Sequence, residues 1–233
     1  MKRILISAIL IAAIMIGCTG CTFDNKPKQN VNELALKYLE QKYGEKFEYG
    51  APAGASYTGT RTFLAACESF DDYWVLVQID NFEDEENWVI RDNYIAIKYA
   101  EQMSDYLSQI VNNQFGESKM YYAPAGKTLS ADLPADATFD DYRMDSSGTI
   151  NGIAVVKKSD YKDMEQLSQV METITSNCAA ASISLVVLVI EDSKYIDCDL
   201  SKARDYNIRN NFFAKGEIFR ANDKISIDYY GGE

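Results

Sequence analysis

A stretch of twenty-four residues occurs twice in this sequence in related form. VNELALKYLEQKYGEKFEYGAPAG begins at Val31, MSDYLSQIVNNQFGESKMYYAPAG begins at Met103, and the two align without a gap. In both copies an apolar stripe with helical spacing, a Gly-Glu pair and a tyrosine precede Ala-Pro-Ala-Gly. Glycine commonly ends a helix, because it adopts the left-handed backbone conformation that other residues disfavour. The repeat therefore predicts two helices that end at Gly44 and Gly116, each followed by a short strand.

The tetrapeptide that closes each copy has the pattern of a type I β-turn, with proline at the second position and glycine at the fourth. We therefore predict that residues 51–54 and 123–126 both reverse the chain. Phe-Asp-Asp-Tyr follows each copy, at Phe70–Tyr73 and Phe139–Tyr142, but the spacing differs by three residues. This second motif is weaker support for a duplication. Two equivalent binding loops are the functional alternative to the structural interpretation.

The other apolar segments alternate between strand and helix patterns. They predict strands around 60–68, 72–80, 152–158 and 183–191, helices around 100–115 and 159–174, and a terminal hairpin closed over 221–224. The strand at 183–191 is the most apolar, which is typical of a central strand. The sequence predicts an α+β fold, an antiparallel sheet with packed helices, built from two units that share the helix–strand–turn repeat. These units are residues 31–126 and 127–233.

The amino-terminal segment has the organisation of a secretory signal. Lys2 and Arg3 precede an uncharged, mostly apolar run from Ile4 to Ile16. A helix needs about twenty apolar residues to span a bilayer, so this run is too short for a permanent span. The run ends in MIGC at Met15–Cys18, which resembles the lipobox of bacterial lipoproteins, although leucine is usual where this sequence has Met15.

The resemblance implies that residues 1–17 are removed as a signal peptide and that Cys18 becomes a lipid-modified amino terminus. Cys21 is an alternative attachment site three residues later. Two or more acyl chains, such as palmitate, attach a protein stably to a membrane. Residues 18–30 are largely polar and form a predicted flexible tether. We expect a protein anchored by lipid on the extracytoplasmic face of the cell membrane. A plain signal peptide or an uncleaved anchor with incidental cysteines is the alternative.

The sequence also resembles poorly characterised envelope lipoproteins of Gram-positive bacteria, in which a helix similar to YLEQKYGEKF follows the tether. That resemblance implies no activity. The formal net charge is −12, and it becomes −14 after the signal is removed, with 21 basic and 35 acidic residues. A strongly acidic surface disfavours nucleic acid as a partner. The membrane, contacted through the lipid, is therefore the first predicted partner.

The composition excludes several kinds of catalytic site. The chain has no histidine, which removes Ser-His-Asp and Cys-His catalysis and most zinc sites that use imidazole. Ser159–Lys162 fits the SxxK pattern of acyl-transferring enzymes, but its companion motifs are absent. We interpret Ser159 or Asp160 as a helix N-cap, and the acidic run at Asp80–Asn87 as a solvated turn. We assign no catalytic residue, no metal site and no cofactor.

Three cysteines remain after the lipid-attachment region, namely Cys67, Cys178 and Cys198. An odd number prevents complete pairing within the chain. Cys178 and Cys198 flank the predicted strand at 183–191, which would separate them by more than the roughly 7 Å between Cα atoms that a disulfide allows. We therefore predict no disulfide.

Tyrosine doublets at Tyr121–Tyr122 and Tyr229–Tyr230 are typical of half-buried strands, and an exposed aromatic surface for a peptide or glycan is the alternative. We expect a binding or interaction module with an unidentified ligand, which could be an envelope protein, a peptide or a glycan. The alternative is an envelope hydrolase that uses carboxylates alone.

The lipobox interpretation predicts the mass of the mature protein. If Cys18 is the mature amino terminus, the intact mass of protein purified from a bacterial membrane will lack residues 1–17 and include acyl groups. A Cys18→Ser variant should lose the acyl mass, and Cys21→Ser serves as its matched control. An unmodified chain that begins at another residue would contradict the prediction. A lipidated chain that begins at Cys21 would retain the anchor and change only its position.

Overall fold

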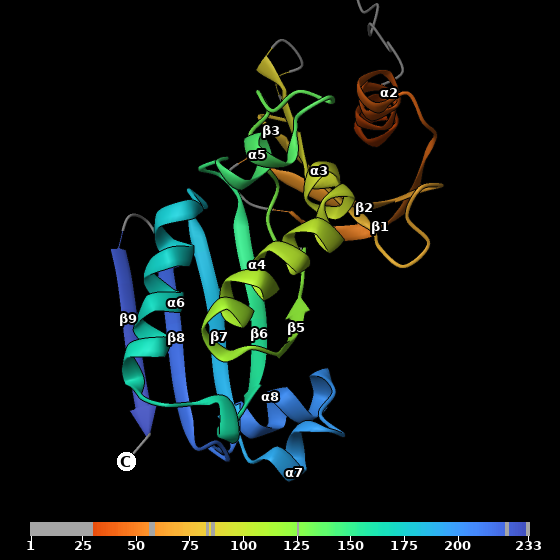
Figure 1. Cartoon of the computed structure of the whole chain (residues 1–233). Coiled ribbons are helices and arrows are strands. Elements are labelled where there is room, and N and C mark those ends of the chain that lie inside the picture. Colours follow the sequence, from red (N-terminus) through yellow and green to blue (C-terminus); the bar gives the residue numbers. More distant parts are fainter. Residues whose placement is uncertain are drawn as a thin grey trace, which may run out of the picture.

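The computed structural model of the protein describes residues 30–55, 59–82, 84, 87–124, 126–221 and 224–231. The predicted signal peptide, both candidate lipid-attachment residues, Cys18 and Cys21, and the predicted tether up to residue 29 lie outside these residues. The described chain forms two β-sheets with helices packed against them (Figure 1). This arrangement confirms the predicted α+β class.

The first sheet is an antiparallel meander in the order β1-β2-β3-β4. Its strands are β1 (Phe47–Ala55), β2 (Arg61–Cys67), β3 (Val75–Asp80) and β4 (Val89–Asp92). Side chains on β2 and β3 alternate between buried and half-buried positions, as expected for a sheet with one face on the core. Helix α2 (Val31–Tyr43) contacts β1, and its side chains Ala35 and Leu39 are fully buried.

The second sheet has the order β5-β6-β7-β8-β9. Its strands are β5 (Ser118–Tyr122), β6 (Thr149–Lys157), β7 (Ser182–Ile190), β8 (Ala214–Ala221) and β9 (Lys224–Gly231). Strand β7 is central, and β8 and β9 form the predicted terminal hairpin. The prediction of antiparallel pairing throughout is wrong for this sheet, because β6 and β7 are parallel. Parallel neighbours need a long crossover connection, which the helix between them provides.

Helices pack on both faces of the second sheet. On one face α4 (Ala100–Phe115) and α6 (Met164–Asn177) pack against the sheet and against each other. The other face carries a smaller apolar cluster that joins β6 and β7 to α7 (Asp192–Tyr195) and α8 (Leu200–Ile208). Figure 1 shows α4 and α6 in front of the sheet and α7 and α8 near its lower end. Strand β7 is consequently buried on both faces, which explains why its sequence is almost continuously apolar.

The two sheets share one continuous apolar core. The main cluster of buried side chains extends from Ala35 on α2 through α3 (Tyr94–Lys98) and α4 to Ile218 on β8. Strand β5 and helix α4 belong with the second sheet, because both pack on β6. Both elements therefore associate with the second sheet, although they fall within residues 31–126, the first of the two predicted units.

The predicted ends of the two repeated helices are confirmed. Helix α2 ends at Tyr43 and is followed by Gly44 with φ 73°, and α4 ends at Phe115 and is followed by Gly116 with φ 81°. Both values lie in the region that side chains other than glycine disfavour. A strand follows in each case, β1 in the first copy and β5 in the second. The helix–strand part of the repeat is therefore present in the structure.

The predicted turn at residues 51–54 is wrong. These residues continue β1 as an extended strand, in which Ala51 pairs with Leu64 and Pro52 pairs with Phe63. Two register irregularities interrupt this ladder, and proline is tolerated in a strand at an edge or a bulge, where no ladder bond needs its missing N–H group. In the second copy the strand ends at Tyr122, and Ala125 lies outside the described residues. The shared tetrapeptide therefore does not mark a shared turn.

Other helical segments also differ from the predictions. Helix α6 begins at Met164 rather than near Ser159, and the side chain of Asp163 caps it by accepting hydrogen bonds from two backbone N–H groups. Ser159 and Asp160 lie instead in a 3₁₀ turn (Lys158–Asp160). Helix α5 (Phe139–Arg143) occupies a segment for which no helix was predicted, and its start is a capping box between Thr138 and Asp141. Helices α7 and α8 were not predicted.

A polar junction connects α2, the first sheet and the helices that follow it. Asp92, which is 3% exposed, ends β4 and accepts hydrogen bonds from Tyr43 Oη at 2.7 Å, Lys42 Nζ at 3.1 Å and its near neighbour Tyr94 N at 3.0 Å. Its backbone carbonyl accepts from Leu129 N at 2.8 Å. The next residue, Asn93, is fully buried and accepts from the backbone N–H of Leu76 on β3 at 2.7 Å. These two residues therefore connect four separate segments of the chain.

Removal of the Asp92 carboxylate should destabilise the whole protein. In an Asp92→Ala variant the Lys42 ammonium, whose side chain is 12% exposed, would be left without its partner, and the Tyr43 hydroxyl would lose its acceptor. Breaking a buried ion pair by removing one partner costs about 3 kcal/mol. We expect a loss of this order in the free energy of unfolding, measured by urea denaturation.

The matched control is Glu48→Ala, which removes the exposed Lys46–Glu48 ion pair. Exposed pairs contribute little, so this change should alter the free energy of unfolding by less than about 0.5 kcal/mol. Equal effects of the two substitutions would contradict the role assigned to Asp92.

Candidate groove between the two sheets

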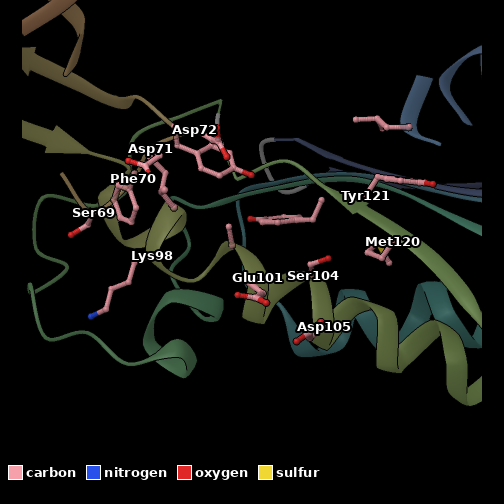
Figure 2. Close-up of a pocket in the computed structure, with 15 residues that line it drawn as sticks. Ser69, Phe70, Asp71, Asp72, Lys98, Glu101, Ser104, Asp105, Met120 and Tyr121 are labelled. Carbon is pink, nitrogen blue, oxygen red and sulfur yellow. The ribbon is translucent and has the colours of Figure 1, made fainter. Parts of the chain in front are cut away.

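An open groove lies where the first sheet, α4 and β5 meet, with a cavity volume of about 690 Å³ (Figure 2). Four separate segments line it: the loop after β2, the end of α3 with the start of α4, strand β5, and the start of α8. The lining includes four carboxylates, one lysine and four aromatic side chains. These are Asp71, Asp72, Glu101, Asp105, Lys98, Phe70, Tyr73, Tyr121 and Tyr122.

The loop after β2 is fixed at its base by Glu45. Its carboxylate accepts hydrogen bonds from Cys67 Sγ at 2.8 Å, from Ser69 Oγ at 2.6 Å and from the Tyr94 hydroxyl. Phe70, the first residue of the Phe-Asp-Asp-Tyr motif, packs on the Tyr94 ring with centroids 4.9 Å apart. Three donors and an aromatic contact therefore determine where the two aspartates of this loop lie.

Electrostatics in this cluster keep the donors protonated. Burial, together with the Glu45 carboxylate, raises the pKa of Cys67 to about 11, and the same two causes raise the pKa of Tyr94. Burial acts to raise the pKa of Glu45, but hydrogen bonds from Cys67, Ser69 and Tyr94 outweigh it and hold this pKa below its usual value. The loop is thus attached to an ionised carboxylate at neutral pH.

The far end of the same loop rests on the first sheet. Trp74 follows the motif directly, and its ring lies against Gly50 of β1, where a Cβ atom would overlap the ring. Tyr122 occupies the aligned position in the second copy of the repeat. Glycine at position 50 therefore allows the tryptophan to cover β1, and this contact distinguishes the first copy from the second.

Helix α4 contributes the opposite wall of the groove. Its buried side chains, Met103 and Leu107, face the core, whereas Glu101 and Asp105 are exposed. Residues four apart lie on one face of a helix, so both carboxylates project from the same side of α4. Figure 2 shows their labelled side chains on α4, across the hollow from the loop that bears Asp71 and Asp72.

Strand β5 forms the floor of the groove and is fixed on both faces. Tyr121 Oη donates to Cys198 O at 2.8 Å, and Lys119 Nζ donates to Ile196 O at 2.8 Å, which attaches the segment before α8. On the other face the Tyr122 and Tyr142 hydroxyls lie 2.7 Å apart. Burial raises the pKa of both Tyr121 and Tyr122, so both rings are neutral.

The groove can attract cations and contact flat or apolar groups. Among the described residues of the lining, four carboxylates are exposed to water and Lys98 is the single cation. Within the described part of the chain, no group of three or more His, Cys, Asp or Glu side chains is arranged to hold a metal ion. The chemistry available is therefore diffuse negative charge beside aromatic surface.

The structure separates sequence motifs that look equivalent. Phe70–Tyr73 lines the groove, whereas Phe139–Tyr142 forms most of α5, so the two copies are not equivalent loops. Tyr121–Tyr122 lines the groove, but Tyr229–Tyr230 lies on β9 at the far edge of the second sheet. The three described cysteines, Cys67, Cys178 and Cys198, are buried free thiols.

The comparisons with known proteins give little further information. No protein-family model matches the sequence, and no curated protein matches it. A crystal structure of a DUF5037 family protein from Ruminococcus gnavus is similar, with 15% sequence identity over 84% of this chain and 94% of that chain. The TM-score of 0.39 is too low for this similarity to support an argument about function.

The Glu45 cluster predicts a pH-dependent contribution to stability. A carboxylate whose pKa is lower in the folded protein stabilises the fold above its unfolded pKa, and this contribution is lost as the pH falls through the folded pKa. We expect the difference in the free energy of unfolding between the wild-type protein and Glu45→Gln to be largest near neutral pH. It should narrow below about pH 4, where Glu45 becomes protonated and resembles glutamine.

Urea denaturation at a series of pH values measures this difference. Glu68→Gln is the control, because Glu68 is exposed on the same loop. A Glu45→Gln variant whose stability follows the wild-type profile in parallel at every pH would show that the cluster does not act as described.

Proposed function

We propose that this protein is a lipid-anchored binding module on the extracytoplasmic face of the cell membrane, and that its groove binds a positively charged ligand. The anchor rests on the resemblance of Met15–Cys18 to a lipobox, and no structural observation bears on it. Among the described helices, none has the length and apolar character needed to cross a bilayer. The proposed contact with the membrane is through lipid at Cys18, or at Cys21.

The observation that carries the ligand proposal is the composition of the groove. Four exposed carboxylates surround a hollow whose lining also includes Phe70, Tyr73, Tyr121 and Tyr122. Carboxylates attract cations, and aromatic faces add a further attraction for ammonium and guanidinium groups. The overall charge of the chain has the same sign, which strengthens the field that a cation meets.

The groove favours a binding function over the alternative, a hydrolase that uses carboxylates alone. A carboxyl group that donates a proton at neutral pH is generally shielded from water by apolar surroundings. The carboxylates of the groove are instead exposed. An envelope hydrolase remains the alternative from the sequence, but no feature of the groove favours it.

A polyamine tests whether the groove recognises positive charge. Spermine should bind a shortened chain that begins at Asn30, and calorimetry should show the highest affinity at low salt and a lower affinity as salt is added. The test variant combines Asp71→Asn, Asp72→Asn, Glu101→Gln and Asp105→Asn. An exposed ion pair contributes about 0.5 kcal/mol, so four lost contacts should weaken binding roughly thirtyfold.

The control variant carries the same change of net charge at exposed carboxylates outside the groove lining. It combines Asp132→Asn, Asp136→Asn, Glu165→Gln and Glu172→Gln. This variant should bind spermine nearly as well as the wild-type protein. Equal losses in both variants would mean that spermine responds to total charge, and the groove would then not be the binding site.

A further inference from the structure

Strand β5 has one free edge. It lies at the end of the second sheet, and among the strands of the described residues it pairs only with β6. Beyond the strand, Ala123 N donates to Asn151 O at 2.9 Å, which fixes the alternation of the ladder. In an antiparallel pair every second residue exchanges both backbone bonds with its partner. Lys119 and Tyr121 therefore bond to β6, and the backbone N–H and C=O groups of Met120 point away from it.

The groove runs along this free edge. Met120, Tyr121 and Tyr122 all line it, although neighbouring side chains of a strand point to opposite faces of the sheet. Met120 and Tyr122 pack with the core under α4, and Tyr121 packs with the cluster under α8. A hollow that touches both kinds of residue must lie at the edge of the strand. Figure 2 shows β5 bordering the hollow, with the carboxylates of α4 beside it.

We propose that the groove binds an extended peptide segment by adding it as a sixth strand beside β5. Outward-facing backbone groups of an edge strand form a template for such pairing, and peptide-binding domains use this mode of recognition. The outward register falls on Ser118, Met120 and Tyr122, so a short segment is sufficient. This inference rests on the proposed function and names the chemical class of its ligand.

The walls of the groove specify the side chains of that segment. Residues of the added strand alternate between the face of α4 and the face of α8. On the α4 face they meet Glu101 and Asp105, which favour lysine or arginine. On the α8 face they meet Tyr121 and Leu200, which favour apolar side chains. The ligand is therefore a segment in which basic and apolar residues alternate.

A short synthetic peptide of alternating lysine and valine tests the pairing on the unaltered protein. Two derivatives are compared with it, one N-methylated at every lysine and the other at every valine. Since the alternation fixes which side chains face α4, a segment that binds β5 in one direction turns only one set of its peptide N–H groups toward β5. We expect one derivative to bind at least about tenfold more weakly than the parent peptide and the other to bind nearly as well. Equal affinities of all three peptides would overturn the proposal.

A substitution on β5 tests the same contact from the side of the protein. Met120→Pro removes the outward N–H group and leaves the bonds of β5 to β6 in place. Met120→Ala is the matched control, because it shortens the side chain and keeps the N–H group. Peptide affinity should fall at least about tenfold in the proline variant relative to the alanine variant, while spermine affinity stays the same in both.

The outcomes separate this inference from the proposed function. If neutralising the groove weakens spermine and peptide alike, but neither N-methylation nor Met120→Pro affects peptide binding, the groove binds cations without strand addition and the inference is wrong. If the peptide binds the variant with a neutralised groove as tightly as the wild-type protein, the proposed function fails as well. Sedimentation that shows a dimer of the chain, with no peptide bound, would also overturn the inference.

Discussion

The buried carboxylate of Asp92 connects parts of the chain that share no regular secondary structure. The carboxylate accepts hydrogen bonds from Lys42 and Tyr43 at the end of α2. The backbone carbonyl of the same residue accepts a hydrogen bond from Leu129, in the segment between β5 and β6 of the second sheet. Burial and the neighbouring Asp92 carboxylate raise the pKa of Tyr43, so its hydroxyl remains a donor. Such a buried group stabilises the fold only while all its partners are in place. The arrangement of α3 and α4 behind the groove depends on this junction.

The local patterns of the sequence predicted the elements whose physical cause is local. Helix ends at Gly44 and Gly116, the central position of β7 and the terminal hairpin all follow from glycine conformation, apolar content or turn chemistry within a few residues. The extended conformation of residues 51–54 could not be predicted in this way. Strand β2 pairs with these residues, and this pairing overrides the preference of the tetrapeptide for a turn. The parallel pairing of β6 and β7 likewise depends on a partner outside either strand.

Local sequence patterns could not predict the groove either, because it depends on residues that are distant from one another in the sequence. Its residues come from four places in the sequence, and Asp71, Glu101 and Tyr121 become neighbours of one hollow only after both sheets have formed. The sequence drew attention to two of the contributing motifs, Phe70–Tyr73 and the Tyr121–Tyr122 doublet, but it paired each with a copy that lies elsewhere in the fold. No motif in the sequence singled out Glu101 and Asp105 on the predicted helix. Only their place opposite the loop gives them a second interpretation.

Trp74, which packs against Gly50, gives this protein an intrinsic fluorescence signal from the first sheet. The chain has two tryptophans, Trp74 and Trp88, and both lie just before strands of the first sheet. Tryptophan emission therefore follows the unfolding of that sheet, whereas circular dichroism follows both sheets, so a comparison of the two signals shows whether the shared core melts as one unit. Trp74 is 51% exposed and adjoins Tyr73 in the groove lining. The wavelength or the intensity of its fluorescence emission should therefore change when a molecule binds in the groove, without any added dye.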